Sequence, residues 1–172
     1  MFRIFLQETY EVLDAIFYDK ALNGTGNYND NWRKVPNITE LSITRNSDGT
    51  LLDYVSTSSQ RYIQLFPRNT PSIDIDVPYI VEFDIVELNG YVLFQAIGKD
   101  STNTTRYYGR QIVTGHIKVE LQHDSVKMWA DNVNIYNNAS YDLPTTANLA
   151  FVFDKNQGNA SLKYKNFKVY PI

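Results

Sequence analysis

Three acidic residues, Glu82, Asp84 and Glu87, lie close together in the segment VEFDIVELNG. A pair of carboxyl groups can cleave a glycosidic bond when one protonates the leaving oxygen and the other attacks or activates water. Glu82 and Asp84 alternate with apolar residues, so in a β-strand they would share one face, about 6.6 Å apart. The same alternation is typical of the solvated face of an ordinary strand. The segment therefore leaves two interpretations open, paired catalytic acids or a polar strand surface.

A second group of residues could bind sugars without cleaving them. Aromatic rings cover the apolar CH face of a pyranose, while amide, carboxylate and guanidinium groups bond its hydroxyls. Trp129 lies between Met128 and Ala130, which alternation places on the inner face of a strand, so we expect the indole on the polar face. Trp129 is therefore a candidate ligand contact, with coverage by a loop as the alternative.

The segment KDSTNTTRYYGRQ holds the densest cluster of aromatic and cationic residues, and we interpret it as a loop. Its candidate binding residues are Arg106, Tyr107, Tyr108 and Arg110. Such a composition suits recognition, although a capping loop or a subunit contact would need the same residues. Tyr136 and Tyr141, in NIYNNASYDLP, form a second candidate rim.

Composition and charge argue against several other functions. The formal charge is −3 and there is no run of Lys or Arg, so the sequence predicts no basic surface that would bind a nucleic-acid backbone. The sequence has no cysteine and two separated histidines, His116 and His123, which excludes Cys-based zinc sites and gives a Ser-His-Asp triad little support. No stretch approaches the ~18 apolar residues of a membrane span. The first twenty residues lack the pattern of a signal peptide.

Apolar residues recur mainly with a period of two between Gly-, Asn- and Asp-rich turns, which predicts an all-β protein. The clearest element is a hairpin over residues 115–132. Because 172 residues can bury one sufficient core, residues 1–172 are predicted to form a single domain. Short strands at this spacing favour an antiparallel β-sandwich, most simply a jelly roll.

Two changes of apolar phase predict irregular strands. After Val81, Phe83 and Ile85, the apolar series is expected to continue with Val86 and Leu88, a slip that is typical of a β-bulge and would turn Glu87 toward the face of Glu82. A second shift is expected at Lys165–Asn166.

The hairpin HIKVELQHDSVKMWADNVNI resembles that of laminin-G and concanavalin A-like sandwiches, where a similar strand pair ends in a Val-x-Leu-Tyr-Val-Asp-Gly turn. Here Asn132 stands in place of the glycine. The segments FYDKALNGTGNYNDNW and SLKYKNFKVYPI are similar to the first and last strands of carbohydrate-binding jelly rolls, which phage tail and other virion proteins carry. The resemblance implies a sugar ligand and a structural Ca²⁺ where the first and last strands meet, with Asp19 and Asp154 as candidate ligands.

The segment EFDIVE also resembles the acid motif of family 16 glycoside hydrolases, which belong to the same superfamily. That resemblance implies Glu82 as nucleophile, Asp84 as its electrostatic support and Glu87 as the acid/base. The Trp-containing, Gly-rich run that precedes the motif in these enzymes is replaced here by VPYI. The chain is also short for a catalytic cleft.

The sequence therefore favours a non-catalytic carbohydrate-binding accessory or structural protein of a phage particle, adhering to a host cell-surface glycan. A composition rich in Asn, Tyr, Ile and Lys fits a virion protein of a low-GC host. The expected partners are cell-surface polysaccharide and other virion proteins, with a homo-oligomer as one arrangement, and no cofactor is required beyond the candidate Ca²⁺. The alternatives are a purely structural decoration or fibre subunit and a small glycosidase.

Overall fold

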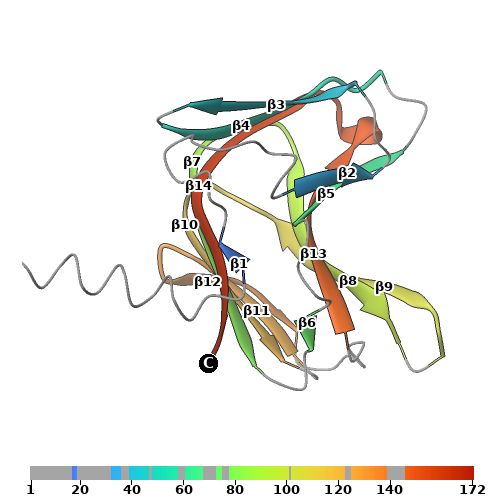
Figure 1. The fold of residues 1–172 in the computed structure, drawn as a ribbon, viewed down its shortest axis with the longest axis vertical. Helices are drawn as coiled ribbons and strands as arrows, with labels where there is room; N and C mark the ends of the chain where they lie inside the picture. Colours follow the sequence, from blue (N-terminus) through green and yellow to red (C-terminus); the bar gives the residue numbers. More distant parts are fainter. Residues whose placement is uncertain are drawn as a thin grey trace, which may run out of the picture.

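A computed structural model of the chain describes residues 17–18, 32–35, 39–46, 48–57, 61–67, 73–74, 78–100, 102–122, 125–138 and 146–172. Most of these residues belong to β-strands, which form two antiparallel sheets that face each other (Figure 1). The predicted antiparallel β-sandwich of the jelly-roll class is confirmed. Within the described ranges, no helix is long and apolar enough to cross a membrane.

The larger sheet follows the order β12-β11-β10-β7-β14-β4-β3, and a short strand β1 also pairs with β14. Its strands are β1 (Phe17–Tyr18), β3 (Leu41–Asn46), β4 (Gly49–Tyr54), β7 (Tyr79–Asn89), β10 (Gly115–Gln122), β11 (Ser125–Ala130), β12 (Val133–Asn138) and β14 (Ala160–Pro171). The predicted hairpin of residues 115–132 is confirmed as β10 and β11, with Val119 opposite Met128 and both side chains buried.

The smaller sheet follows the order β2-β5-β13-β8-β9, and a short strand β6 also pairs with β13. Its strands are β2 (Trp32–Val35), β5 (Tyr62–Pro67), β6 (Ile73–Asp74), β8 (Val92–Lys99), β9 (Thr105–Gln111) and β13 (Thr146–Asp154). A single turn of 3₁₀-helix, η2 (Lys155–Gln157), connects β13 toward β14.

The long strands β7 and β14 pair with two irregularities, and both were predicted. Ile85 faces Tyr164 and Glu87 faces Lys163, so Val86 is extruded from the ladder. This bulge is confirmed, but Val86 does not continue the core-facing series as predicted. It is 42% exposed, and Leu88 resumes the packing against the core, because a bulged residue turns out of the alternation.

The second irregularity lies near the middle of β14. Lys165 faces Asp84 and Lys168 faces Glu82, so two residues of β14, Asn166 and Phe167, stand opposite one residue of β7. Asn166 has a φ of 58°, a left-handed conformation that Asn tolerates better than most residues. The predicted phase shift is confirmed, and it lets Phe167 point into the core while Asn166 stays on the outer face.

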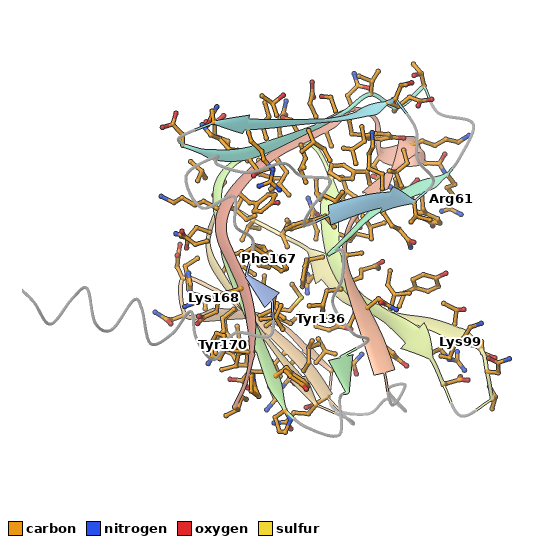
Figure 2. All side chains as sticks on the ribbon, viewed as in Figure 1. Arg61, Lys99, Tyr136, Phe167, Lys168 and Tyr170 are labelled. Atoms are coloured by element: carbon orange, nitrogen blue, oxygen red, sulfur yellow. The ribbon has the colours of Figure 1, made fainter. Side chains whose placement is uncertain are left out.

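Four phenylalanines join the two sheets. The Phe83 ring centroid lies 5.2 Å from that of Phe167 in the same sheet, and 4.9 and 5.3 Å from those of Phe94 and Phe151 in the smaller sheet. All four rings are buried, and Figure 2 shows Phe167 between the sheets. Burial of such a ring stabilises the fold by roughly 1.5–3 kcal/mol. The sandwich therefore fixes the outward direction of the polar side chains on both sheets.

Candidate functional site

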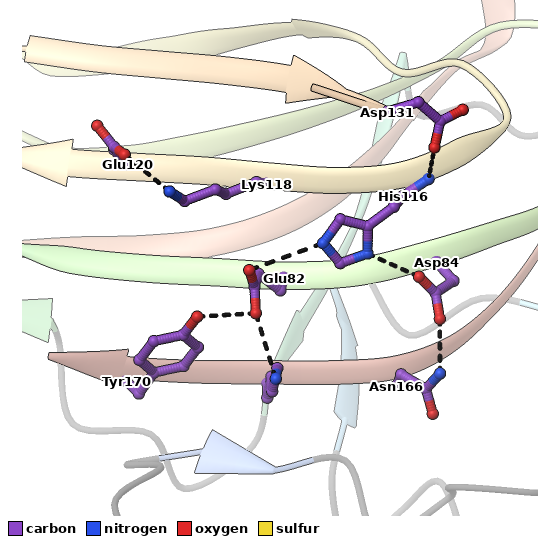
Figure 3. A network of polar contacts seen from close by, with 9 residues as sticks. Glu82, Asp84, His116, Lys118, Glu120, Asp131, Asn166 and Tyr170 are labelled. Atoms are coloured by element: carbon purple, nitrogen blue, oxygen red, sulfur yellow. Dashed lines mark hydrogen bonds and ion pairs between the residues drawn. The ribbon is translucent and has the colours of Figure 1, made fainter. Parts of the chain in front are cut away.

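The outer face of the larger sheet carries the three acidic residues that the sequence singled out. Val81, Phe83 and Ile85 are buried in the core, so Glu82 and Asp84 point to the opposite face of β7. Figure 3 shows both carboxylates in a network of polar contacts with side chains of the neighbouring strands β10 and β14.

The Glu82 carboxylate has three partners. Its Oε2 accepts a hydrogen bond from the Tyr170 hydroxyl at 2.8 Å and lies 3.2 Å from Lys168 Nζ, while its Oε1 lies 3.7 Å from His116 Nε2. Burial alone would raise the pKa of Glu82, but the hydrogen bonds from Tyr170 and Lys168, together with nearby positive charge, outweigh that effect and lower the pKa. Glu82 is thus held as an ionised carboxylate.

The Asp84 carboxylate is equally engaged. His116 Nδ1 lies 2.8 Å from Asp84 Oδ1, and Asn166 Nδ2 donates to Asp84 Oδ2. His116 therefore bridges Asp84 and Glu82, and its backbone N–H donates to Asp131 Oδ1 at 2.8 Å. These contacts tie β10, β7 and β14 together on their outer face.

Glu87 lies on the same face but away from this network. The bulge at Val86 turns Glu87 outward, as predicted, and its Oε1 lies 3.2 Å from Lys163 Nζ. Four regular strand steps, roughly 13 Å, separate it from Glu82 along β7. Carboxyl pairs of retaining glycosidases stand about 5–5.5 Å apart. The strand therefore does not pair Glu82 with Glu87 in the way that the hydrolase resemblance implies.

Trp129 also lies on this outer face, and its predicted place on the polar side of its strand is confirmed. It is half-buried between Lys118 of β10 and Asn134 of β12. Lys118 Nζ lies 5.6 Å from the indole centroid, within cation–π range, and 3.0 Å from Glu120 Oε1. The charged neighbours of the indole are thus already paired with each other.

The segment KDSTNTTRYYGRQ was predicted to be a loop. In the structure it forms a hairpin turn followed by strand β9. The Asp100 carboxylate closes the turn by accepting hydrogen bonds from the Thr102 hydroxyl and backbone N–H, the Thr104 N–H and Arg106 Nε. The bond from the Thr102 hydroxyl outweighs burial and, with the others, lowers the pKa of Asp100. This local network explains why a polar, Thr-rich run extends a sheet.

Strand alternation divides the predicted aromatic and cationic cluster between two faces. Tyr108 faces Ala96 and is buried in the core at 5% exposure, so its predicted role as a ligand contact is wrong. Tyr107 faces Ile97 on the outer side of the smaller sheet and is 57% exposed. Arg106 and Arg110 are in phase with Tyr108 and so leave β9 on the side opposite to Tyr107.

Of the two tyrosines predicted to form a second rim, the structure describes only Tyr136. Tyr136 packs against the core from the inner face of β12, and its hydroxyl accepts a hydrogen bond from Asn138 at 3.0 Å (Figure 2). Tyr141 lies outside the described residues, so the rim that it was predicted to form with Tyr136 stays a prediction.

Of the two candidate calcium ligands, only Asp154 lies within the described residues, and Asp19 does not. Asp154 is buried, accepts a hydrogen bond from the Asn156 N–H at 2.9 Å and lies 3.7 Å from Arg61 Nε. The described part of the chain contains no group of three or more His, Cys, Asp or Glu residues that could hold a metal. The calcium site stays a prediction.

The outer face of the smaller sheet carries a set of side chains that sequence reasoning did not bring together. Ile63, Phe94 and Phe151 point into the core, so their neighbours in the chain point outward. We call the outward set the amide–tyrosine face; it consists of Tyr62, Gln64, Gln95, Tyr107, Gln111 and Asn148. The same face also carries the apolar residues Leu93, Ile97, Ala150 and Val152, of which the last three are buried.

The polar side chains of the amide–tyrosine face are exposed or partly exposed. The two tyrosines, Tyr62 and Tyr107, are 43% and 57% exposed. Among the described residues, none of the four amide side chains has a hydrogen-bond partner in the protein. Each amide can both donate and accept, as a sugar hydroxyl requires. This face thus differs from that of the larger sheet, where the charged groups satisfy one another.

No protein-family model matches the sequence, and no curated protein does so either. Solved structures do resemble the fold. A chain from work on endo-acting O-glycanases, with which members of the human gut microbiota initiate mucin breakdown, superposes with a TM-score of 0.58 and 10% identity, over 92% of this chain and 99% of that one.

Two agarases contain a similar domain. An exo-β-agarase matches with a TM-score of 0.55 and 13% identity over 91% of this chain. The agarase AgWH50C matches with a TM-score of 0.54 and 10% identity over 88% of this chain. The present chain spans about a quarter of each, 25% and 24%. At such identities the likeness establishes a shared β-sandwich fold, one that occurs within carbohydrate-active proteins.

Proposed function

We propose that the protein is a non-catalytic glycan-binding domain whose binding surface is the amide–tyrosine face. The single observation that carries this proposal is the presence of four unengaged amide side chains between two exposed tyrosines, Tyr62 and Tyr107, on one sheet face. Tyrosine rings can cover the apolar face of a sugar, and side-chain amides can bond its hydroxyls. The occurrence of the fold in agarases supports the same class of ligand.

The absence of catalysis is part of the proposal. On the larger sheet, Glu82 and Asp84 share His116, and Glu87 is paired with Lys163. On the smaller sheet, Asp154 lies at the edge of the amide–tyrosine face and is buried. A glycosidase would need an acid and a nucleophile or base beside the bound sugar.

We further propose that the domain acts on the surface of a phage particle and attaches it to a host cell-surface polysaccharide. A composition rich in Asn, Tyr, Ile and Lys supports this location. A surface on one sheet face is expected to bind each glycan weakly, so many copies on one particle would be needed for adhesion. A purely structural virion subunit would leave Tyr62 and Tyr107 in protein contacts instead.

Trp129 offers a second candidate binding surface, favoured by its half-exposed indole on the outer face of the larger sheet. The two candidates lie on opposite sides of the sandwich, so single substitutions separate them. Binding of the wild-type chain, Tyr107→Ala and Trp129→Ala to surface polysaccharides from low-GC Gram-positive bacteria should be compared by isothermal titration calorimetry.

We expect saturable binding by the wild-type chain, weaker binding by Tyr107→Ala and unchanged binding by Trp129→Ala. Loss of binding only in Trp129→Ala would move the site to the larger sheet. Saturation without released sugar is expected, whereas continuous release of reducing ends would establish a glycosidase. The absence of binding to every polysaccharide would contradict the proposed function.

A further inference from the structure

The strand register places the two tyrosines at opposite corners of the amide–tyrosine face. Tyr62 of β5 lies opposite Asp154, and Tyr107 of β9 lies opposite Ile97, which in turn faces Asn148 of β13. The two tyrosines are therefore three strands apart and six residues apart along β13. With regular strand spacing and rise, roughly 24 Å separates their backbone positions. Figure 2 labels Arg61, beside Tyr62, and Lys99, near Tyr107, at opposite ends of this sheet.

The diagonal between the tyrosines passes over Val152 and Gln95. Val152 lies opposite both Gln64 and Leu93, and Gln95 lies opposite both Ala150 and Gly109. Because Ala150 has a short side chain and Gly109 has none, the Gln95 amide has no large side chain directly opposite it on either neighbouring strand. Gln64 and Gln111 flank the diagonal on the row of Val152, so hydrogen-bonding groups lie on both of its sides.

The described residues along this diagonal carry no charge. Asp154, at the Tyr62 end, is buried and lies 3.7 Å from Arg61, and Lys99, at the other end, donates to the Asn103 carbonyl at 3.1 Å. Arg61 also lies 4.7 Å from the Tyr62 ring centroid, which orients that ring. Among the residues that the structure describes, a charged sugar would find no counter-ion between the tyrosines and would lose hydration there without compensation.

On the basis of the proposed function, we infer that the ligand is an uncharged polysaccharide, bound through an internal stretch of the chain that runs diagonally from Tyr62 to Tyr107. A single sugar ring cannot contact tyrosines that stand this far apart. An extended chain of several rings contacts both, with Gln95 bonding a sugar near its middle. Neither a chain end nor a charged group is needed for recognition.

The test measures binding of neutral oligosaccharides of increasing length, prepared from agarose, β-glucan and mannan, with polygalacturonate as the charged counterpart. Affinity of the wild-type chain should rise with length and then level off once both tyrosines are covered. Blocking the chain ends should change nothing. Tyr62→Ala and Tyr107→Ala should each lower the affinity for the longest ligand about tenfold. In each variant, affinity should level off at a shorter oligosaccharide length.

Three results would overturn the inference while leaving glycan binding intact: a monosaccharide that binds as tightly as the long chain, preference for polygalacturonate, or binding that depends on Trp129 and on neither tyrosine. Absence of binding to all of these ligands and to the bacterial polysaccharides would overturn both the inference and the proposed function. Circular dichroism of each variant separates loss of binding from loss of fold.

Discussion

Tyr107 and Tyr108 are neighbours in the chain but lie on opposite sides of the smaller sheet. Tyr107 is 57% exposed on the outer face, whereas Tyr108 is 5% exposed within the core. Strand β9 imposes this division because successive side chains of a strand point in opposite directions. Tyr107 can therefore contact a ligand, whereas Tyr108 packs in the core.

The first prediction concerns Tyr107. Tyr107→Ala should weaken glycan binding about tenfold, equivalent to ~1.4 kcal/mol, because an exposed ring that contacts the ligand is removed. The free energy of unfolding should change by less than about 0.5 kcal/mol, as is usual for exposed positions. Calorimetric titration and urea unfolding measure the two quantities on the same sample.

The second prediction uses Tyr108→Ala as the matched substitution. Removing this buried ring should lower the free energy of unfolding by about 3 kcal/mol, since it leaves a cavity in the core. Whatever protein remains folded should bind glycan with an affinity close to that of the wild type. Equal loss of binding in both variants at equal folded fraction would contradict the assignment of Tyr107 alone to the surface.

Gln95 provides a third prediction. Gln95→Leu keeps the size of the side chain but removes its donor and acceptor, so binding should weaken by about 1 kcal/mol without loss of stability. Gln122→Leu, at the end of β10 in the larger sheet, is the matched control and should bind as the wild type does. An unchanged affinity in Gln95→Leu would remove Gln95 from the proposed binding surface.

The network around Glu82 predicts a pH dependence of stability. The pKa of Glu82 is lowered in the folded protein, chiefly by hydrogen bonds from Tyr170 and Lys168 acting against burial. Its contribution is therefore complete above the ordinary value of 4.5 and is lost as the pH falls through the lower, folded value.

The Glu82→Gln variant tests this dependence. At pH 7 it should be less stable than the wild type by about 1 kcal/mol, because the Tyr170 hydroxyl and Lys168 lose an ionised acceptor. The difference should shrink as the pH falls below 4.5. Urea unfolding at a series of pH values gives the result, and a difference that does not change with pH would disprove the electrostatic account of this network.

Asp100 gives a fifth prediction, about the turn that positions β9. Asp100→Ala removes the acceptor for Thr102, Thr104 and Arg106 and should lower the melting temperature. Because β9 carries Tyr107, glycan binding should weaken as well. Thr102→Val, which removes only one of the donors, should show a smaller change in both quantities. A turn variant with wild-type stability would show that other contacts hold β9.

Much of the fold could be predicted from the alternation of apolar and polar residues alone. The hairpin of β10 and β11 and the irregularities of β7 and β14 were predicted, because each leaves a trace in the order of apolar residues. The exposure of Val86 was missed, since a valine in a bulge looks the same in sequence as a valine in the core. Strand β9 was missed because a turn stabilised by Asp100 has the polar composition of a loop.

The candidate site was less accessible to sequence reasoning. Gln64, Gln95 and Asn148 belong to three strands that are far apart in the chain, and each alone is an ordinary polar residue of a strand. Only the register of the smaller sheet places them on one surface. The adjacent tyrosines Tyr107 and Tyr108 gave a strong compositional signal, but the sequence does not show which of the two faces the core.

The central claim, that the smaller sheet binds glycan through Tyr62 and Tyr107, is tested most directly by titrating the double variant Tyr62→Ala/Tyr107→Ala with a polysaccharide that the wild type binds. The account predicts that the double variant remains folded, with an unchanged circular dichroism spectrum, and shows no saturable heat. Saturable binding of the folded double variant with wild-type affinity would contradict the claim.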